Sequence, residues 1–180
     1  MSLYKMYQTE VKSALKKTFG YKNDLAVPKI IKVSLNVGVG RFTKDKAYID
    51  GVVNTLTRIT GQKPILTKAR KSISAFKVRE GNIVGVVVTL RGARMYDFLD
   101  KLINITLPRV RDFRGFGEKI VDKTGNLSVG LREHLSFPEV KADEVDNIHG
   151  IEISVTTTAK TKAEGLELFK LIGFPFKKPV

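Results

Sequence analysis

The sequence predicts an α+β fold: a single domain over residues 1–180 in which helices cover one face of a mainly antiparallel sheet. The other face of the sheet stays open, basic and polar. Two kinds of periodicity predict this fold. Apolar residues alternate with polar or small ones in three segments, as in strands that bury one face. In four other segments they recur every three to four residues, as on amphipathic helices. The order helix, strand, helix, strands, helix, strands, helix is typical of layered α+β folds.

Four helices are expected, covering residues 2–19, 44–60, 93–105 and 161–172. Ser2 can act as the N-cap of the first helix, and Gly20 follows its last turn. Gly61 closes the second helix in the same way. The third helix should end near Pro108, because proline cannot continue a regular helix. Their apolar faces would form the helical layer of the fold.

Three alternating segments are expected to form strands, 28–40, 84–91 and 148–158, and a further strand is expected before the basic loop 68–82. In the first, the residues expected to face the core are Ile31, Val33, Leu35, Val37 and Val39. Those expected on the open face are Lys32, Ser34, Asn36, Gly38 and Gly40. In the second, Val84, Val86, Val88 and Leu90 alternate with Val87, Thr89 and Arg91. The stretch 109–130 is glycine-rich and irregular, with short strand signals.

Positive charge is concentrated in the first two thirds of the chain. The formal net charge is +14. Residues 1–60 carry 11 basic and 4 acidic groups, residues 61–120 carry 13 and 5, and residues 121–180 carry 8 and 9. Such a patterned field attracts a polyanion in a salt-sensitive way, which makes a nucleic acid the expected partner.

The most basic segment is a loop between two strands, residues 68–82. Its cations are Lys68, Arg70, Lys71, Lys77 and Arg79, and its one acid is Glu80. A loop of like charges repels itself unless a partner supplies the counter-charge. We therefore expect this loop to protrude and to contact nucleic acid.

Catalytic and cofactor-binding patterns are not met. Gly38 and Gly40 lack the third glycine of a dinucleotide loop, and no phosphate-loop pattern is complete. The stretch from Arg114 opens like the aromatic RNA-recognition signature but lacks its later aromatic residues. His134 and His149 have no metal or nucleophile spacing and are expected to be surface or core residues. No enzyme activity, metal or cofactor is expected.

Other features also favour a cytoplasmic protein without a membrane partner. The chain has no cysteine, so disulfides and thiolate metal sites are excluded. Its N-terminus does not resemble a signal peptide, and no apolar run has the roughly 20 residues needed to cross a bilayer. The acidic stretch Glu139, Asp143, Glu144 and Asp146 lacks the ligand order of a calcium loop and is interpreted as a solvated connection.

Five segments in one order carry a family resemblance. They are PKIIKVSLNVGVG, GQKPILTKARKSISAFKVREGNIVGVVVTLR, LPRVRDFRGF, REHLSFPEV and TTTAKTKAEGLELFKLIGFPF. Together they resemble the bacterial family of large-subunit ribosomal protein five, which binds 5S rRNA. The resemblance spans about residues 4–177. The chain departs from the family at Glu133-His134, where Glu-Gln is usual, at Leu127, where an aromatic is common, and at Phe116, where leucine is usual.

The resemblance implies a structural role in the central protuberance of the large ribosomal subunit. The implied partners are 5S rRNA, 23S rRNA, peptidyl-site tRNA, small-subunit ribosomal protein thirteen and other central-protuberance proteins. Asn36, Gln62 and Thr89 match the family's 5S rRNA recognition group. The loop 68–82 is implied to touch the tRNA, and the less basic region 107–147 to form an inter-subunit bridge.

Alternation and charge extend the expected 5S rRNA surface beyond that group. Lys32, Ser34 and Arg91 lie on the open sheet face, and Lys12 and Lys16 lie on the first helix. Bridge residues are expected at Arg109, Arg111, Phe113 and Arg114, where arginines alternate with aromatic residues that we expect to be exposed, Phe113 and Phe116. Asp112 supplies an internal counter-charge, and the acidic stretch 139–146 is a second candidate contact. Two alternatives stay open: a general nucleic-acid-binding protein or chaperone outside the ribosome, and an enzyme acting on nucleotides.

Overall fold

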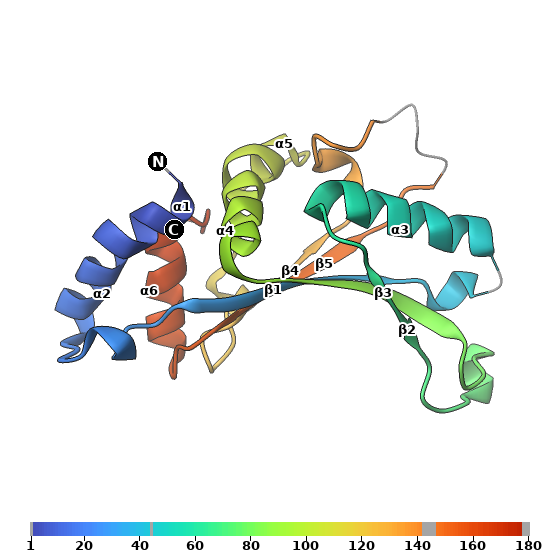
Figure 1. The fold of residues 1–180 in the computed structure, drawn as a ribbon, viewed down its shortest axis with the longest axis horizontal. Helices are drawn as coiled ribbons and strands as arrows, with labels where there is room; N and C mark the ends of the chain where they lie inside the picture. The colour runs from blue at the N-terminus through green and yellow to red at the C-terminus, as the bar shows by residue number, and fades with distance from the viewer. Residues whose placement is uncertain (1, 44, 142–146, 178–180) are drawn as a thin grey trace. The chain divides into compact units, whose positions relative to one another are not determined.

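A computed structural model describes residues 2–43, 45–141 and 147–177. Its five strands form one antiparallel sheet, so the predicted α+β class is confirmed (Figure 1). The strands are β1 (Ile30–Gly38), β2 (Ile65–Lys68), β3 (Ile83–Leu90), β4 (Leu127–Leu131) and β5 (Ile151–Thr157). Their order across the sheet is β2-β3-β1-β5-β4.

The chain divides into two compact units. The first unit comprises Met1–Val33, Leu90–Val129 and Ser154–Val180. The second comprises Ser34–Thr89 and Gly130–Ile153. Each unit therefore combines segments that are far apart in the sequence.

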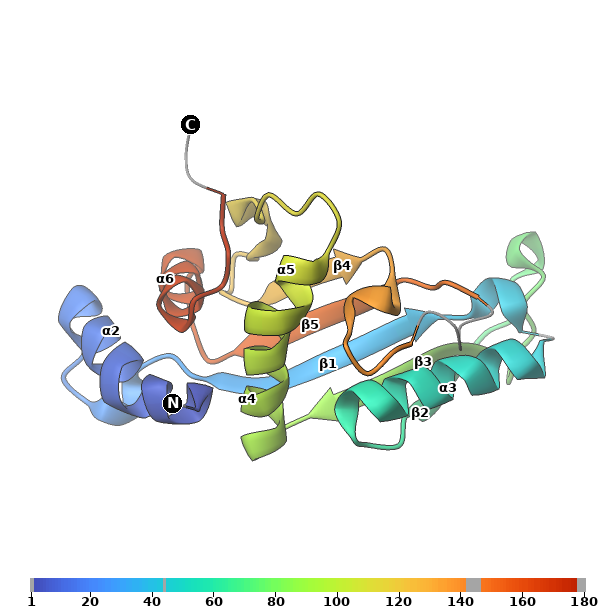
Figure 2. The ribbon, with the colours of Figure 1, turned by 90° about the horizontal axis from the view of Figure 1, so that it is seen from above.

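Helices dominate the first unit. The N-terminal helix consists of α1 (Leu3–Met6), a π-helical turn (Tyr7–Val11) and α2 (Lys12–Phe19) in succession. α1 packs against α4 (Gly92–Lys101), and α2 packs against α6 (Lys162–Ile172), as Figure 2 shows. The Tyr7 hydroxyl donates to the carbonyl of Pro28 at 3.0 Å, which fixes the chain just before β1.

Two details of the predicted helix ends differ in this unit. Ser2 occupies the N-cap position but, among the described residues, makes no side-chain hydrogen bond to the first turn. The third predicted helix ends near Pro108 as expected, but it continues past residue 105, because a π-helical turn (Leu102–Thr106) leads into α5 (Leu107–Arg109). In that wider turn Leu107 donates to the carbonyl of Leu102, so the chain stays helical around a proline that has no N–H to give.

In the second unit, α3 (Lys46–Thr60) lies along one face of the strands (Figures 1 and 2). The Asp45 side chain accepts from the backbone N–H of Tyr48 at 3.0 Å and begins the helix, and Gly61 ends it with φ 65°. Lys44, the predicted first residue, lies outside the described residues. The buried side chains of the helix and strands include Ile49, Val52, Leu56, Ile59, Leu35, Val37, Val86 and Val88.

The predicted alternation of the first strand holds from Val33 to Val39. It fails at the beginning of β1, where Ile30 is buried and Ile31 is 39% exposed. In the second unit the opposite face of the strands carries Ser34, Asn36 and Thr89, all half-buried. These polar side chains therefore remain partly accessible on this face.

Candidate nucleic-acid interface

Four residues on adjacent strands of the second unit form what we call the polar row: Thr67, Gly85, Asn36 and Glu152. Thr67 on β2 pairs with Gly85 on β3, and the side chain of Asn36 on β1 lies beside Gly85. A Cβ built at Gly85 would lie 2.6 Å from the Thr67 hydroxyl oxygen and 3.4 Å from Asn36 Oδ1. Asn36 Nδ2 in turn donates to Glu152 Oε2 on β5 at 3.4 Å. Hydrogen-bonding side chains thus lie on three of four neighbouring strands, and on the fourth an added Cβ at Gly85 would crowd the Thr67 hydroxyl.

The structure brings together two of the three residues of the implied recognition group. Gln62 Nε2 donates to the carbonyl of Thr89 at 3.2 Å, and the backbone N–H and carbonyl of Gln62 both bond the Thr60 hydroxyl. The Gln62 side chain is therefore fixed in place beside β3. Asn36, the third member, lies in the polar row.

Sequence reasoning missed Thr67, Gly85 and Glu152. The signals were present: Gly85 interrupts a run of β-branched residues, which often marks close approach to a strand. Glu152 occupies an outward position in the alternating segment that became β5. The partners of these residues depend on strand order and register, which the sequence alone did not give.

The predicted cations of the first unit are partly paired within the protein. Lys12 and Lys16 lie one helical turn apart, and both contact Asp24, at 3.3 Å and 2.6 Å. Hydrogen bonds from Lys16 and then Lys12 hold the pKa of the Asp24 carboxyl below its usual value. Lys32 is half-buried on β1, and Arg91 is exposed immediately before α4. Two of the four predicted cations therefore share a single carboxylate.

The basic loop 68–82 is not irregular, because backbone hydrogen bonds join its two sides. Ala69 and Asn82 are joined at its base, where the Ala69 N–H donates to the Asn82 carbonyl at 2.8 Å. Nearer the tip, Ile73 and Val78 exchange two backbone hydrogen bonds, and Ser74–Phe76 form a 3₁₀ turn. The predicted cations Lys68, Arg70, Lys71, Lys77 and Arg79 are all exposed. A structured hairpin presents them.

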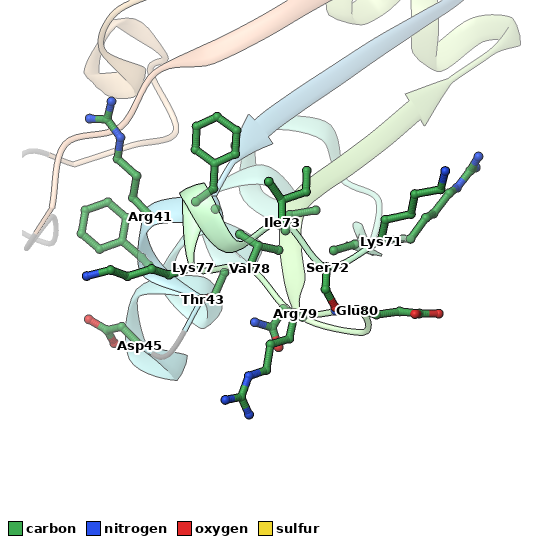
Figure 3. A pocket seen from close by; sticks show the side chains of 18 of the residues that line it. Arg41, Thr43, Asp45, Lys71, Ser72, Ile73, Lys77, Val78, Arg79 and Glu80 are labelled. Atoms are coloured by element: carbon green, nitrogen blue, oxygen red, sulfur yellow. The ribbon is translucent and has the colours of Figure 1, made fainter.

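A broad groove lies along the inner side of this loop (Figure 3). In Figure 3 the side chains of Lys71, Lys77 and Arg79 leave the loop in different directions. Phe76 at the loop tip is 74% exposed, and Phe42, which also lines the groove, packs on Tyr48 with ring centroids 4.2 Å apart. The groove thus combines cations with exposed apolar surface.

The aromatic residues of the predicted bridge segment are not exposed as expected. Phe113 and Phe116 are half-buried, because their rings contact each other at 4.9 Å and Phe116 stacks on Phe174 at 5.5 Å. Phe116 also accepts a backbone hydrogen bond from Lys177 at 2.9 Å. Phe116 therefore packs against the C-terminal segment, and Phe113 packs against Phe116. The arginines that remain exposed on the segment are Arg109, Arg111 and Arg114, with Asp112 lying 4.0 Å from Arg111.

The two histidines are buried residues of the second unit. Their rings stack with centroids 3.8 Å apart, and the His149 backbone N–H donates to His134 Nδ1 at 3.2 Å. Burial, with the charge of His134, lowers the pKa of His149 to about 4. Burial also lowers the pKa of His134. Both imidazoles are therefore neutral near pH 7.

The remaining predicted features give no further site. Glu139 of the acidic stretch is half-buried, whereas Asp143, Glu144 and Asp146 lie outside the described residues. Across the described ranges, His, Asp and Glu side chains form no group that could hold a metal ion. None of the described helices is long and apolar enough to cross a membrane.

Comparison with known proteins identifies the family. A model of ribosomal protein L5 matches residues 23–79, and a model of the C-terminus of the same ribosomal protein family matches residues 83–176. The large ribosomal subunit protein uL5 of Desulforapulum autotrophicum is 53% identical over 176 residues, 98% of each chain. That of Solibacter usitatus is 51% identical over 96% of each chain, and that of Colwellia psychrerythraea is 50% identical over 99% of this chain and 98% of its own. Since the matches cover nearly the whole sequence, the chain belongs to the ribosomal protein L5 family of structural, non-enzymatic proteins of the large ribosomal subunit.

Proposed function

We propose that the open sheet face and the first helix bind 5S rRNA and help to attach it to 23S rRNA in the central protuberance. Family membership makes the chain a structural constituent of the large ribosomal subunit, and the bacterial relatives of the chain are cytoplasmic. The finer assignment rests on the geometry of the sheet surface.

The observation that carries the proposal is the arrangement of Asn36, Gln62 and Thr89. Asn36 and Thr89 lie on one sheet face of the second unit, and the Gln62 side chain is held beside β3 by its hydrogen bond to the Thr89 carbonyl. Short amides and hydroxyls can bond both phosphate oxygens and the ribose 2′-hydroxyl, which distinguishes RNA from DNA. Lys12, Lys16, Lys32 and Arg91 would add salt-dependent attraction to the phosphates.

A comparison of ligands tests this assignment against the two alternatives. Filter binding of the purified chain to 5S rRNA, to a DNA duplex of equal length and to nucleotides should give tight binding to 5S rRNA only. Equal affinity for the duplex would favour a general nucleic-acid-binding protein. Binding of nucleotides would favour an enzyme.

The loop 68–82 supports contact with a second RNA, the peptidyl-site tRNA. Its exposed cations lie on a hairpin that has its own hydrogen bonds. The cations can therefore contact a phosphate backbone that does not touch the sheet surface. Contacts of cations with phosphate carry no sequence information, which suits a site that must accept every tRNA.

The arginine segment supports a bridge to small-subunit ribosomal protein thirteen. Its exposed arginines can form bidentate bonds with carboxylates, while Phe113 contributes through its packing on Phe116 rather than as a free ring. Changing Arg109, Arg111 and Arg114 to alanine should weaken association of the subunits while 5S rRNA incorporation stays normal. Full-strength association of the triple variant would remove the bridging role.

A further inference from the structure

The sheet surface carries one group that a phosphate-binding surface should avoid, the carboxylate of Glu152. It is exposed in the second unit, at the end of the polar row. Among the described residues it accepts from Asn36, and no described lysine or arginine forms an ion pair with it. A carboxylate repels a phosphate. If RNA lies on this surface, Glu152 must face donors, and the donors that RNA offers are the N–H groups of bases and the 2′-hydroxyls.

Apolar surface lies beside the polar row. Ile65 pairs with Val87 across β2 and β3, two residues along from the pair Thr67 and Gly85. Residues two apart on a strand share a face, so Ile65 and Thr67 lie on the same face. Ile65 is 72% exposed, so its aliphatic side chain is open to a partner. A flat, uncharged ring could cover it.

Between these two features, Gly85 lets the side chains of Thr67 and Asn36 close over β3. Since a Cβ at this position would meet the Thr67 hydroxyl at 2.6 Å, the surface at the row depends on a residue without a side chain. Asn36 Oδ1 lies on this side, and Asn36 Nδ2 points to Glu152. Along the row, the amide oxygen of Asn36 and the carboxylate of Glu152 are therefore two neighbouring hydrogen-bond acceptors.

The geometry points to the polar row as a reader of one unpaired guanine base in the RNA. Guanine is the base whose pairing edge presents two adjacent N–H donors, N1–H and the N2 amino group, to the two oxygens of a carboxylate. Glu152 would accept both, Asn36 would orient the carboxylate, and the ring would lie over the row, toward the apolar side chains of Val87 and Ile65. This inference rests on the proposed binding of 5S rRNA and adds base selection to contacts that otherwise read the backbone.

Electrostatic repulsion alone predicts that removing the Glu152 carboxylate strengthens RNA binding, whereas base reading predicts that it weakens RNA binding. If the carboxylate reads a base, Glu152→Gln should weaken binding of 5S rRNA roughly tenfold, as expected for loss of a bidentate base contact. If it only repels phosphates, the same change should strengthen binding. Asp50→Asn is the matched control, because Asp50 is exposed in the same unit on α3, away from the strand face that carries the row.

The experiment is inosine interference mapping of 5S rRNA with the wild-type chain, Glu152→Gln and Asp50→Asn. Inosine lacks the N2 amino group of guanine. We expect one or more unpaired guanines whose replacement by inosine weakens the wild-type and Asp50→Asn complexes, with no such effect in Glu152→Gln. Identical interference in all three proteins, or tighter binding by Glu152→Gln, would overturn the inference. If the wild-type chain fails to bind 5S rRNA, the proposed function fails instead.

Discussion

At the scale of single residues, the pairing of Lys12 and Lys16 with Asp24 affects how the first helix can meet RNA. Both lysines are held by one carboxylate whose pKa they lower. Because the pKa of Asp24 is lower in the folded chain, the two ion pairs stabilise the folded state at pH values above the usual pKa of an aspartate. This stabilisation is lost as the pH falls through the lowered pKa. Near neutral pH the carboxylate competes with phosphates for both lysines.

Asp24→Asn should therefore strengthen binding of 5S rRNA at low salt by a few fold. Two lysines would then be free for phosphates, so the dependence of log affinity on log salt should steepen by about 1.4–1.8. Titrations at several salt concentrations measure both quantities. Weaker binding by the variant would mean that Asp24 serves mainly to position the lysines.

The stacked histidines predict a pH dependence of stability. The pKa of His149 is lowered to about 4 from 6.5, so between these values the unfolded chain takes up a proton that the folded chain does not. Stability should fall as the pH drops from about 6.5 to about 4, by on the order of 3 kcal/mol from this group. Urea unfolding of the wild-type chain and His149→Gln across this range checks it. Equal slopes in the two proteins would exclude His149 as the cause.

At the scale of elements, α6 meets the turn before β4 in the first unit at a pair of glycines. A Cβ on Gly165 would lie 2.4 Å from the Cα of Gly125, and Gly125 itself has φ 77°. In contrast, Gly51 on the exposed side of α3 has nothing within 4 Å of its Cβ position. The two helical glycines thus predict opposite effects of the same substitution.

Gly165→Ala should destabilise the chain by about 1–3 kcal/mol, because backbone on both sides must shift. Gly51→Ala should stabilise it by about 0.5–1 kcal/mol, because alanine is the better helix former. Thermal or urea unfolding compares the two variants. Little change in Gly165→Ala would show that α6 and the turn can separate without cost.

The basic loop makes a prediction at the same scale. Its own hydrogen bonds, such as those joining Ile73 and Val78, do not involve its cations. Neutralising Arg70, Lys71, Lys77 and Arg79 should therefore preserve the hairpin, leave 5S rRNA affinity within about twofold and weaken tRNA retention on the ribosome. Equal loss of both activities would assign the loop to the 5S rRNA surface.

At the scale of the whole molecule, the features predicted best from sequence were those with local causes. The helix ends at Gly20 and Gly61 follow from the left-handed backbone that glycine adopts easily, and both are found with positive φ. The alternation from Val33 to Val39 follows from the burial of one strand face. Charge patterning correctly indicated exposed cations in the loop 68–82.

Features that depend on distant segments were missed or wrong. Phe113 and Phe116 were expected to be exposed, but Phe174 and the C-terminal segment cover them from nearly 60 residues away in the sequence. The polar row needed the strand order β2-β3-β1-β5, so Thr67 and Glu152 could not be joined to Asn36 in advance. Tertiary packing and strand register decided these two features.

The central claim is that the polar sheet face of the second unit binds 5S rRNA, and alanine variants of Asn36 and Thr89 test it most directly. Asn54→Ala, on the exposed side of α3, is the matched control. With folding verified by unfolding curves, titration of 5S rRNA should show a loss of about 1–3 kcal/mol for each face variant, because desolvated bonds are removed. The control should bind as the wild-type chain does. Unchanged affinity in both Asn36→Ala and Thr89→Ala would contradict the account.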